Sequence, residues 1–414
     1  MDIIFSNVAG FDVHQKNVFV CVRQVQAPEQ TVQEEVRTFG TMTSDILQLR
    51  AWLKTLRVTH VAMEATGVLW KPLWNLLEGH FTLLLVNPRE LKQVPGRKSD
   101  VRDCQWIAQL LQCGLLRSSF VPERPQRELR DLTRHRAQLT SEHTRIANRI
   151  HKVLEDANIK LGAVASDLLG ASGRAMLKAM LQGERDPAKL AALARGALRN
   201  KIPQLQLALQ GNFTEHHRYL IESHFDHLEY LEKQIDSFSA RIEECTRPFV
   251  SDEQLERLDK IVGVNRRTIE NVTAEIGSNM APFPDADHLS SWAGLCPGNE
   301  ESAGKRKRSR ITKGNRWLRR ALAEAAWAAT RSKKSYLATQ YHRLAARRGK
   351  KRALVAVAHS ILVIFYHMFK QPVEYRDLGK DFFARLNPER LKRSLVKRLQ
   401  AMGFEVTLSP RSAA

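Results

Sequence analysis

Two aspartates three residues apart open an expected helix in the first third of the chain. Asp100 and Asp103 follow Ser99, which we expect to cap a helix whose apolar side chains recur between Trp106 and Leu111. This spacing places both carboxylates on one face of the first helical turn, where they can converge on one divalent cation. The alternative is that acids at this end only complement the helix dipole.

Two further acids interrupt apolar strands upstream of this pair. Asp12 lies within the run Val8–His14, and Glu64 lies within the run His60–Gly67. A carboxylate on a buried strand costs several kcal/mol unless a cation or another partner accompanies it. The four acids together therefore favour a metal site, although each strand acid could instead sit at an edge with its carboxylate in water.

A serine followed at once by a cationic run marks the last third of the chain. A serine nucleophile that attacks phosphate needs access, which Ala303 and Gly304 beside Ser302 can give, and cations that stabilise the developing charge. Alone, such a serine is usually only a turn or capping residue. The residues expected to bind nucleic acid are Lys305, Arg306, Lys307, Arg308, Arg310, Lys313, Arg316 and Arg319.

The elements that would position the acids alternate between strand and helix patterns. Two β-rich runs, Val8–His14 and Val18–Val22, predict a hairpin, and Val32–Phe39 predicts a third strand. Ser44 is expected to cap a helix that reaches Leu56. The run His60–Gly67, a helix Val68–Leu77 and a strand Phe81–Val86 follow. A hairpin followed by β-α-β units predicts an α/β domain, a mixed sheet with helices on its faces.

Two long helices are expected in the middle of the chain. They cover about Glu123–Leu161 and Thr214–Phe249, and the stretch Gly162–Gly211 between them predicts short helices. Apolar residues recur every seven positions in both, although Arg136 and His143 interrupt the first seam. The pair is either an antiparallel hairpin within one chain or a contact between subunits, and we expect it to space domains and to assemble a dimer or tetramer. The apolar seam positions are Leu132, Leu139, Ile146 and Val153 in the first helix, and Leu228, Leu231, Ile235, Phe238, Ile242, Cys245 and Phe249 in the second.

The C-terminal third is expected to be mainly helical. A helix through Leu258, a turn at Gly263, and a second helix Thr268–Ile276 are similar to a helix-hairpin-helix element, whose turn amides can contact phosphates. Asn265 replaces the usual second glycine, and we expect it in a left-handed conformation. Further helices are expected at 317–329 and 353–369, and the tail 371–414 shows no catalytic pattern.

Composition points to a polyanionic partner. The chain has 414 residues and a net charge of +21, and residues 301–370 carry 19 Lys and Arg against 2 Asp and Glu. Nucleic acid is the expected partner of such a segment. The five cysteines lack C-x-x-C spacing, which indicates a reducing compartment rather than disulfides or zinc. No apolar stretch is expected to span a membrane, so we expect a cytoplasmic protein.

These motifs together resemble those of the IS110-type transposases, in particular their IS1111-like branch. The resemblance rests on Gly10–His14, Met63–Gly67, Lys98–Asp103, and the segment Asn299–Arg319 around Ser302. It implies an N-terminal domain similar to the RuvC resolvases, with an RNase H-like fold. In that family, positions matching Asp12, Glu64, Asp100 and Asp103 hold Mg²⁺ or Mn²⁺, and a serine matching Ser302 attaches covalently to DNA.

The resemblance implies a DNA recombinase that excises and inserts its own mobile element through a phosphoserine, guided by an RNA that the element encodes. It also implies association with the bacterial nucleoid. Two alternatives stay open: a RuvC-like nuclease in which the acids activate water, and a non-catalytic nucleic-acid-binding protein. The expected division is a RuvC-like domain 1–120, a helical spacer 121–250, a transposase domain 251–370 and a tail 371–414.

Overall fold

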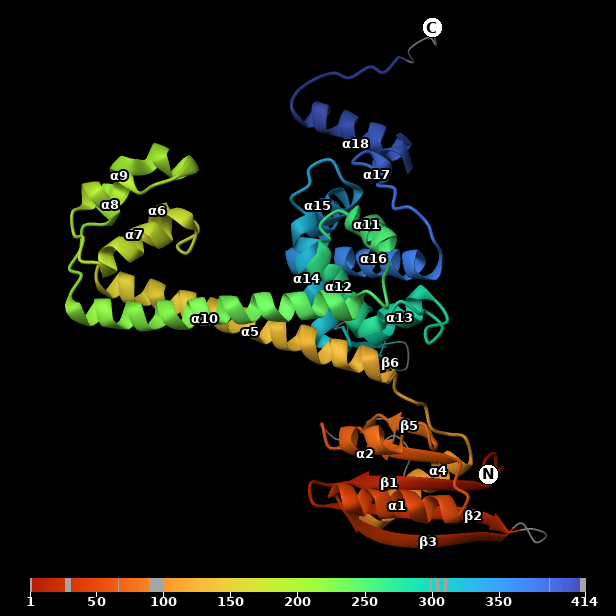
Figure 1. The fold of residues 1–414 in the computed structure, drawn as a ribbon. Coiled ribbons are helices and arrows are strands. Elements are labelled where there is room, and N and C mark those ends of the chain that lie inside the picture. The colour runs from red at the N-terminus through yellow and green to blue at the C-terminus, as the bar shows by residue number, and fades with distance from the viewer. Residues whose placement is uncertain are drawn as a thin grey trace. The chain divides into compact units, whose positions relative to one another are not determined.

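The computed structural model describes residues 2–26, 31–65, 67–88, 100–297, 300–302, 305–308, 311–386 and 388–409. The side chains of 100–102, 300–302, 305–308 and 390 are outside that description. The chain divides into two compact units, Met1–Pro122 and Glu123–Ala414. Figure 1 shows a mixed α/β first unit and a helical second unit, and each is described by itself.

The first unit is built on a five-stranded mixed sheet with the order β3-β2-β1-β4-β5. The strands are β1 (Asn7–Val13), β2 (Asn17–Gln26), β3 (Thr31–Gly40), β4 (His60–Glu64) and β5 (Thr82–Val86). The first three pair antiparallel, whereas β4 lies parallel to β1 and β5 parallel to β4. The sequence predicted this mixed sheet, and the topology is consistent with an RNase H-like fold.

Helices cover both faces of this sheet. The face that presents Phe11 and Met63 packs against α1 (Thr43–Thr55) and α2 (Trp70–Leu77) in the largest core of the unit. The opposite face packs against α4 (Asp100–Gln112) through Ile107 and Leu111. The expected cap Ser44 is wrong, because Met42 precedes the first turn of α1 and Asp45 closes a capping box onto its backbone amide. The expected cap of α4, Ser99, lies outside the described residues.

The second unit begins with two long antiparallel helices, α5 (Arg124–Asp156) and α10 (Glu215–Thr246). Figure 1 shows them side by side, with the short elements α6 (Leu161–Val164), α7 (Ala171–Leu181), α8 (Pro187–Ala192), η1 (Gly196–Lys201) and α9 (Ile202–Ala208) at one end. The intrachain pair is therefore present, and assembly between subunits stays a prediction.

The buried seam of α5 differs from the expected heptads. Leu139 and Ile146 are buried, but Leu132 and Val153 are only partly so, and Ile150 and Leu154 take part instead. The first seam residue expected to interrupt the pattern, Arg136, is itself buried. The shift follows from α5 packing against two different cores along its length, one with α12 (Arg266–Ile276) and one with the short helices.

The C-terminal part surrounds one apolar helix, α16 (Lys350–Lys370). Helix α16 contacts α13 (Ala286–Ala293), α14 (Arg316–Ala329) and α15 (Tyr336–Arg348), and α11 (Asp252–Asp259) packs against α12. By length and composition alone α16 is long and apolar enough to cross a membrane, although no stretch of that length was expected. Its buried residues Val357, Ile361 and Phe365 identify it as the core helix of this part.

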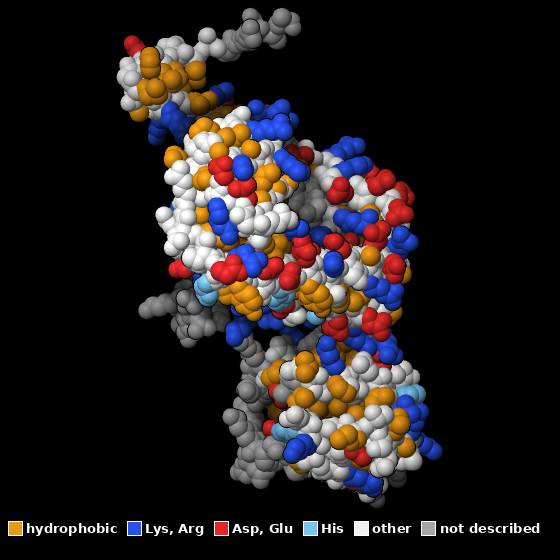
Figure 2. All heavy atoms as spheres, turned by 60° about the vertical axis from the view of Figure 1, so that its left-hand side comes forward, with side chains coloured by type: hydrophobic (Ala, Val, Ile, Leu, Met, Phe, Trp, Pro, Cys, Tyr) orange, Lys and Arg blue, Asp and Glu red, His pale blue; other side chains and the backbone are white. Residues whose placement is uncertain are grey.

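Two features of the C-terminal part lie outside the predicted pattern. The stretch between the helices expected at 317–329 and 353–369 contains α15, whose N-cap Ser335 accepts a hydrogen bond from the amide of Ala338. The tail contains α17 (Phe382–Leu386) and α18 (Pro388–Ala401). Figure 2 shows apolar side chains gathered on the element that carries the C-terminal tail, and Leu391, Leu395 and Leu399 of α18 are all exposed.

Candidate active site

Two of the predicted acids lie at the carboxyl ends of neighbouring parallel strands. In the register of β1 and β4, Phe11 pairs with Met63, so Asp12 and Glu64 each come one residue later. Because side chains alternate between the faces of a strand, both acids belong to the face opposite Phe11 and Met63, which is the face that α4 covers. Asp12 is only 9% exposed, and Glu64 is half-buried.

Helix α4 lies directly on this end of the sheet because residue 10 has no side chain. A Cβ at Gly10 would stand 2.4 Å from both the Ala108 amide nitrogen and the Cys104 carbonyl oxygen. At the other end, the carbonyl of Gln112 accepts hydrogen bonds from the amides of Ile4 and Phe5 at 2.9 and 3.1 Å. The helix therefore runs opposite to β1, and its first turn, with Asp103, lies toward Asp12. The sequence offered Gly10 as part of a motif but gave no sign of this close contact.

The electrostatics of one thiol link Asp12 and Asp103. Burial raises the pKa of Cys104 to about 11, and the carboxylates of Asp12 and Asp103 contribute in the same direction. Both acids are therefore close enough to act on the same group. Asp12 also contacts His14, whose Nε2 stands 3.1 Å from Asp12 Oδ2. Asp12, Glu64 and Asp103 thus belong to the same end of the first unit, while Asp100 begins α4 with its side chain outside the description.

The donor set fits a hard divalent cation. Carboxylate oxygens are the ligands that Mg²⁺ and Mn²⁺ prefer, and no thiolate or imidazole is needed. Among the side chains that the structure describes, no three of Asp, Glu, His and Cys stand close enough to form a complete metal site. The expected fourth ligand, Asp100, is not among those side chains, so the metal assignment stays a prediction.

In the second unit, Ser302 ends a short strand instead of lying inside a turn. The strand β6 (Glu300–Ser302) pairs antiparallel with β7 (Lys305–Arg308), and Ser302 is opposite Lys305. The predicted cationic run is thus a strand in its own right. Its backbone register places Ser302 next to Lys305, the first cation of the run.

The base of this hairpin is closed by main-chain contacts. Pro297 and Ile311 form an antiparallel bridge that joins the two ends of the segment. Gly294, at φ +72°, ends α13, and a Cβ at Gly314 would stand 2.3 Å from the carbonyl carbon of Ala293. Side chains at 294 or 314 would separate the two backbones. In the sequence, Gly314 was only part of the segment that resembles the family. The structure shows why a glycine is needed there: its backbone packs against that of Ala293.

A buried carboxylate holds the helix that follows the hairpin. Asn315 caps α14 by accepting hydrogen bonds from the amides of Trp317 and Leu318, and its Nδ2 donates to Glu275 Oε2 at 2.6 Å. Glu275 is 2% exposed and accepts two hydrogen bonds of 2.7 Å from Arg134. Burial lowers the pKa of the neighbouring Arg130 guanidinium to about 10, while Glu275 opposes that shift. Glu275 was not among the residues predicted for the site, although an acid near the end of an apolar helix was a usable signal.

The predicted nucleic-acid-binding cations divide into two groups. Lys305–Arg308 form β7 with side chains outside the description, and Arg310 is not among the described residues. Lys313 and Arg316 are exposed, and Arg316 lies 4.8 Å from the ring centroid of Trp317. Arg319 is half-buried and donates to the Thr312 carbonyl at 3.3 Å.

The turn before α12 corrects the expected role of Asn265. Gly263 takes the positive backbone angle, with φ +85°, whereas Asn265 is extended at φ −134°. Asn265 caps α12 by accepting a hydrogen bond from the Thr268 amide at 2.9 Å. At the position where a glycine was expected, Asn265 therefore acts as a helix cap and does not adopt a left-handed backbone conformation.

Comparison with known proteins gives two family matches. A model of a transposase family, the IS110 type with a DEDD domain, matches residues 9–159. A model described as "Transposase IS116/IS110/IS902 family" matches residues 255–342. No curated protein matches the chain. The two matches enclose the four acids and Ser302, and neither distinguishes branches of the family.

Proposed function

Since this chain belongs to the IS110 family of insertion-sequence transposases, we propose that it cuts and rejoins DNA strands through a covalent serine intermediate. The observation that carries this proposal is the register of the β6–β7 hairpin, which sets Ser302 opposite Lys305 at the start of a cationic strand. We propose membership of the IS1111-like branch, as the sequence motifs indicate.

In the proposed reaction, Ser302 Oγ forms a bond to phosphorus while the bond from phosphorus to one deoxyribose oxygen breaks. The serine loses its hydroxyl proton, and the departing deoxyribose oxygen gains one. The number of phosphoester bonds is unchanged, so a hydroxyl of a second strand can later displace the serine without ATP. The cations of β7 and the following segment would stabilise the negative charge on the phosphoryl oxygens.

The acids of the first unit would hold a divalent cation, Mg²⁺ or Mn²⁺, in this proposal. Asp12, Glu64 and Asp103 supply carboxylates at one end of the sheet, and Asp100 is the expected fourth ligand. When bound, such a cation polarises phosphate oxygens and neutralises their charge. The acids and Ser302 must reach the same phosphodiester, either from one chain or from two subunits of a dimer or tetramer. We further propose that an RNA encoded by the element selects the DNA sites.

The test is denaturing electrophoresis after the full-length protein is incubated with Mg²⁺, element-end DNA and co-purified RNA. We expect a protein band linked to DNA that is absent for Ser302→Ala. Ser291→Ala, an exposed serine of α13, is the matched control and should retain the band. Cleavage without any linked band, unaffected by Ser302→Ala, would replace the proposal with hydrolysis of the RuvC type. Absence of both cleavage and linkage in every preparation, with DNA binding retained, would favour a non-catalytic binding protein.

A further inference from the structure

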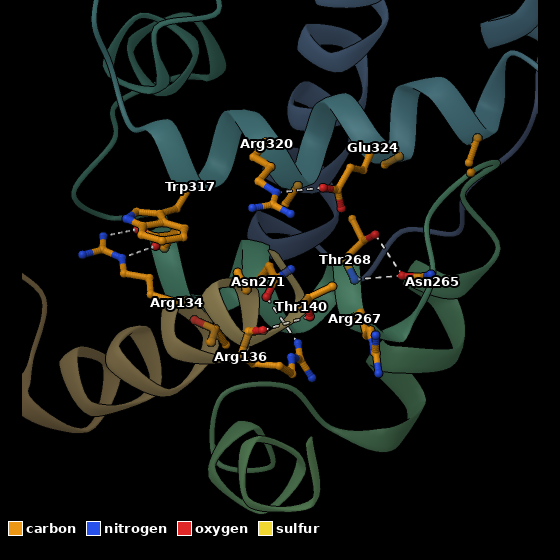
Figure 3. Close-up of a pocket in the computed structure, with 17 residues that line it drawn as sticks. Arg134, Arg136, Thr140, Asn265, Arg267, Thr268, Asn271, Trp317, Arg320 and Glu324 are labelled. Atoms are coloured by element: carbon orange, nitrogen blue, oxygen red, sulfur yellow. Dashed lines mark hydrogen bonds and ion pairs between the residues drawn. The ribbon is translucent and has the colours of Figure 1, made fainter. Parts of the chain in front are cut away.

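A pocket of about 280 Å³ lies in the second unit between α5, α12 and α14. Figure 3 shows side chains of all three helices around it. Part of its wall is formed by small residues, including Ala137, Ala321 and Ala325. Gly263 allows the turn before α12 to touch α14, because a Cβ there would stand 2.4 Å from the Ala325 carbonyl oxygen. Small residues therefore keep space open while three helices stay tightly packed around it.

Cations line this pocket in excess over acids. The lining contains Arg134, Arg136, Arg267 and Arg320 against Glu275 and Glu324. Both glutamates are already engaged: Glu275 by Arg134, and Glu324 by Arg320 at 2.9 Å. Neither carboxylate is left to balance the other arginines. The lining therefore carries a net positive charge even when both of its glutamates are counted as ionised.

Arg136 and Arg267 are the two lining arginines that are not paired with a carboxylate of the lining itself. Arg136 is 3% exposed, and its Nη1 donates to Glu270 Oε2 at 2.6 Å. Glu270 also contacts Arg266 at 3.4 Å, so its charge is shared. Burial lowers the pKa of Arg136, Glu270 opposes the shift, and the nearby charge of Arg267 lowers it further. Arg267 has no ion pair among the residues that the structure describes, and its positive charge acts on Arg136.

The first turn of α12 adds to this positive potential. Arg266 and Arg267 follow the cap Asn265, and the first turn holds no acid. Cations at a helix N-terminus are unfavourable with respect to the helix dipole, and an anion bound there would offset this cost. The side-chain amide of Asn271 also favours an anion. Its Oδ1 accepts a hydrogen bond from Arg136 at 3.3 Å, which leaves its Nδ2 hydrogens available for an acceptor.

We propose that this pocket binds a backbone phosphate of a nucleic-acid strand, with Arg136, Arg267 and Asn271 as the donors. The planar donor fork of arginine matches phosphate oxygens, and the pocket is large enough for one such group. Trp317, with the Arg134 guanidinium 5.9 Å from its ring centroid, borders the pocket at the first turn of α14. A phosphate held here would fix a strand along α14, the helix that follows the Ser302 hairpin. This inference rests on the proposed action on DNA.

The test compares two neighbouring arginines of α12 in the full-length protein. Arg267→Gln removes a pocket cation, and Arg266→Gln removes the same charge from the same turn but outside the pocket lining. Fluorescence anisotropy with labelled element-end duplex DNA is measured across a series of KCl concentrations. Losing one phosphate contact lowers the slope of log affinity against log salt by about 0.9. We expect that change, with about tenfold weaker binding, for Arg267→Gln, and less than a twofold change for Arg266→Gln.

A second variant and a second ligand complete the test. Asn271→Ala removes a donor without changing the charge, and we expect about threefold weaker binding with an unchanged salt slope. Inorganic phosphate is added to wild type and Arg267→Gln in a thermal unfolding assay at constant ionic strength, and we expect equal melting temperatures with and without it. A phosphate-induced increase that only wild type shows, with an unchanged DNA slope, would make this a site for free phosphate and overturn the proposal.

Equal effects of the two arginine variants, or no effect of Arg267→Gln, would also overturn the proposal. The readout is DNA binding and not strand cleavage, so it is independent of the serine chemistry. A wild-type protein that binds DNA with the expected dependence on Arg267 but forms no linked band would retain the pocket and lose the phosphoserine mechanism. A linked band with no dependence of binding on Arg267 would do the reverse.

Discussion

Asn315 Nδ2 donates a hydrogen bond to Glu275 Oε2 across 2.6 Å, although the two residues are 40 positions apart in the sequence. Glu275 lies in the last turn of α12, and Asn315 caps α14, so this contact joins two helices at the exit of the Ser302 hairpin. Arg130 and Arg134 of α5 hold the same carboxylate. One buried acid thus fixes three helices near the proposed nucleophile.

Glu275→Ala should strongly destabilise the second unit. It leaves Arg130, whose side chain is 12% exposed, buried without its counterion, and breaking a buried ion pair costs about 3–5 kcal/mol. Urea unfolding followed by circular dichroism measures this change. Glu324→Gln, which breaks an exposed pair with Arg320, is the control and should cost no more than about 1 kcal/mol. Equal costs would show that the Glu275 cluster does not hold the helices.

Gly10→Ala should displace α4 from the sheet. The added Cβ meets main-chain atoms of Cys104 and Ala108, which no change of rotamer can move, and we expect a loss of about 3 kcal/mol. Gly40→Ala is the comparison, because its Cβ meets only the carboxylate of Asp45, which can rotate away at the cost of its hydrogen bond to the Met42 amide. Thermal unfolding of both variants gives the comparison. A Gly10→Ala protein as stable as Gly40→Ala would contradict the close contact.

Asn265 should behave as a helix cap in substitution experiments. Asn265→Ala removes the acceptor of the Thr268 amide and should cost about 1 kcal/mol, whereas Asn265→Asp should keep most of the stability. Asn265→Gly should cost only a few tenths of a kcal/mol. A left-handed asparagine would give the opposite order, with Asn265→Gly more stable than the native protein. Urea unfolding of the three variants separates the two cases.

Removal of divalent metal should abolish strand cleavage and leave DNA binding in place. If the acids of the first unit hold a cation, Mn²⁺ at 100 times its dissociation constant should stabilise the protein by about 2.7 kcal/mol. Asp12→Asn and Glu64→Gln should lose this stabilisation, whereas Glu35→Gln, a half-buried acid on β3, should keep it. Thermal unfolding with Mn²⁺ and with EDTA measures the effect. Stabilisation of Asp12→Asn equal to that of wild type would place the metal elsewhere.

Stability should depend on pH through Glu232 of α10. Burial alone would raise the pKa of this carboxyl, but hydrogen bonds from Arg174 and from His143 outweigh burial and hold it below the usual value. A lowered pKa means that the unfolded chain binds the proton more readily. The stabilisation is therefore present above the pKa of the unfolded state, near 4.3, and is lost as the pH falls through the lower folded value.

Glu232→Gln tests this dependence by urea unfolding from pH 7 to pH 3. At pH 7 wild type should be the more stable protein, by up to about 1 kcal/mol because the pair is partly exposed, and the two curves should converge at pH 3. Glu222→Gln, an exposed acid on the same helix, should stay parallel to wild type throughout. A constant difference between Glu232→Gln and wild type would contradict the assignment.

Local patterns predicted much of the fold, because hydrophobic alternation and helical periodicity depend only on residues that are close together in the sequence. The hairpin of β1 and β2, the parallel strands β4 and β5, and the long helices α5 and α10 follow from such patterns. The features missed depend on contacts between distant segments. The close approach at Gly10, the role of Glu275 and the buried Arg136 are set by residues 40 or more positions away, which no short window along the chain contains. Helix α15 was missed because its many charges concealed a short apolar face.

Helix α5 takes part in two separate hydrophobic cores, and this limits how its length can change. Its 33 residues correspond to a rod of roughly 50 Å, with one end in the core shared with α12 and the other in the core of the short helices. Inserting a single residue between the two ends would rotate one core against the other by about 100° and lengthen the rod by about 1.5 Å. Length variation in this rod is therefore tolerated only in whole heptads that α10 matches. A natural variant with a longer hairpin should differ from this chain by multiples of seven residues in both helices.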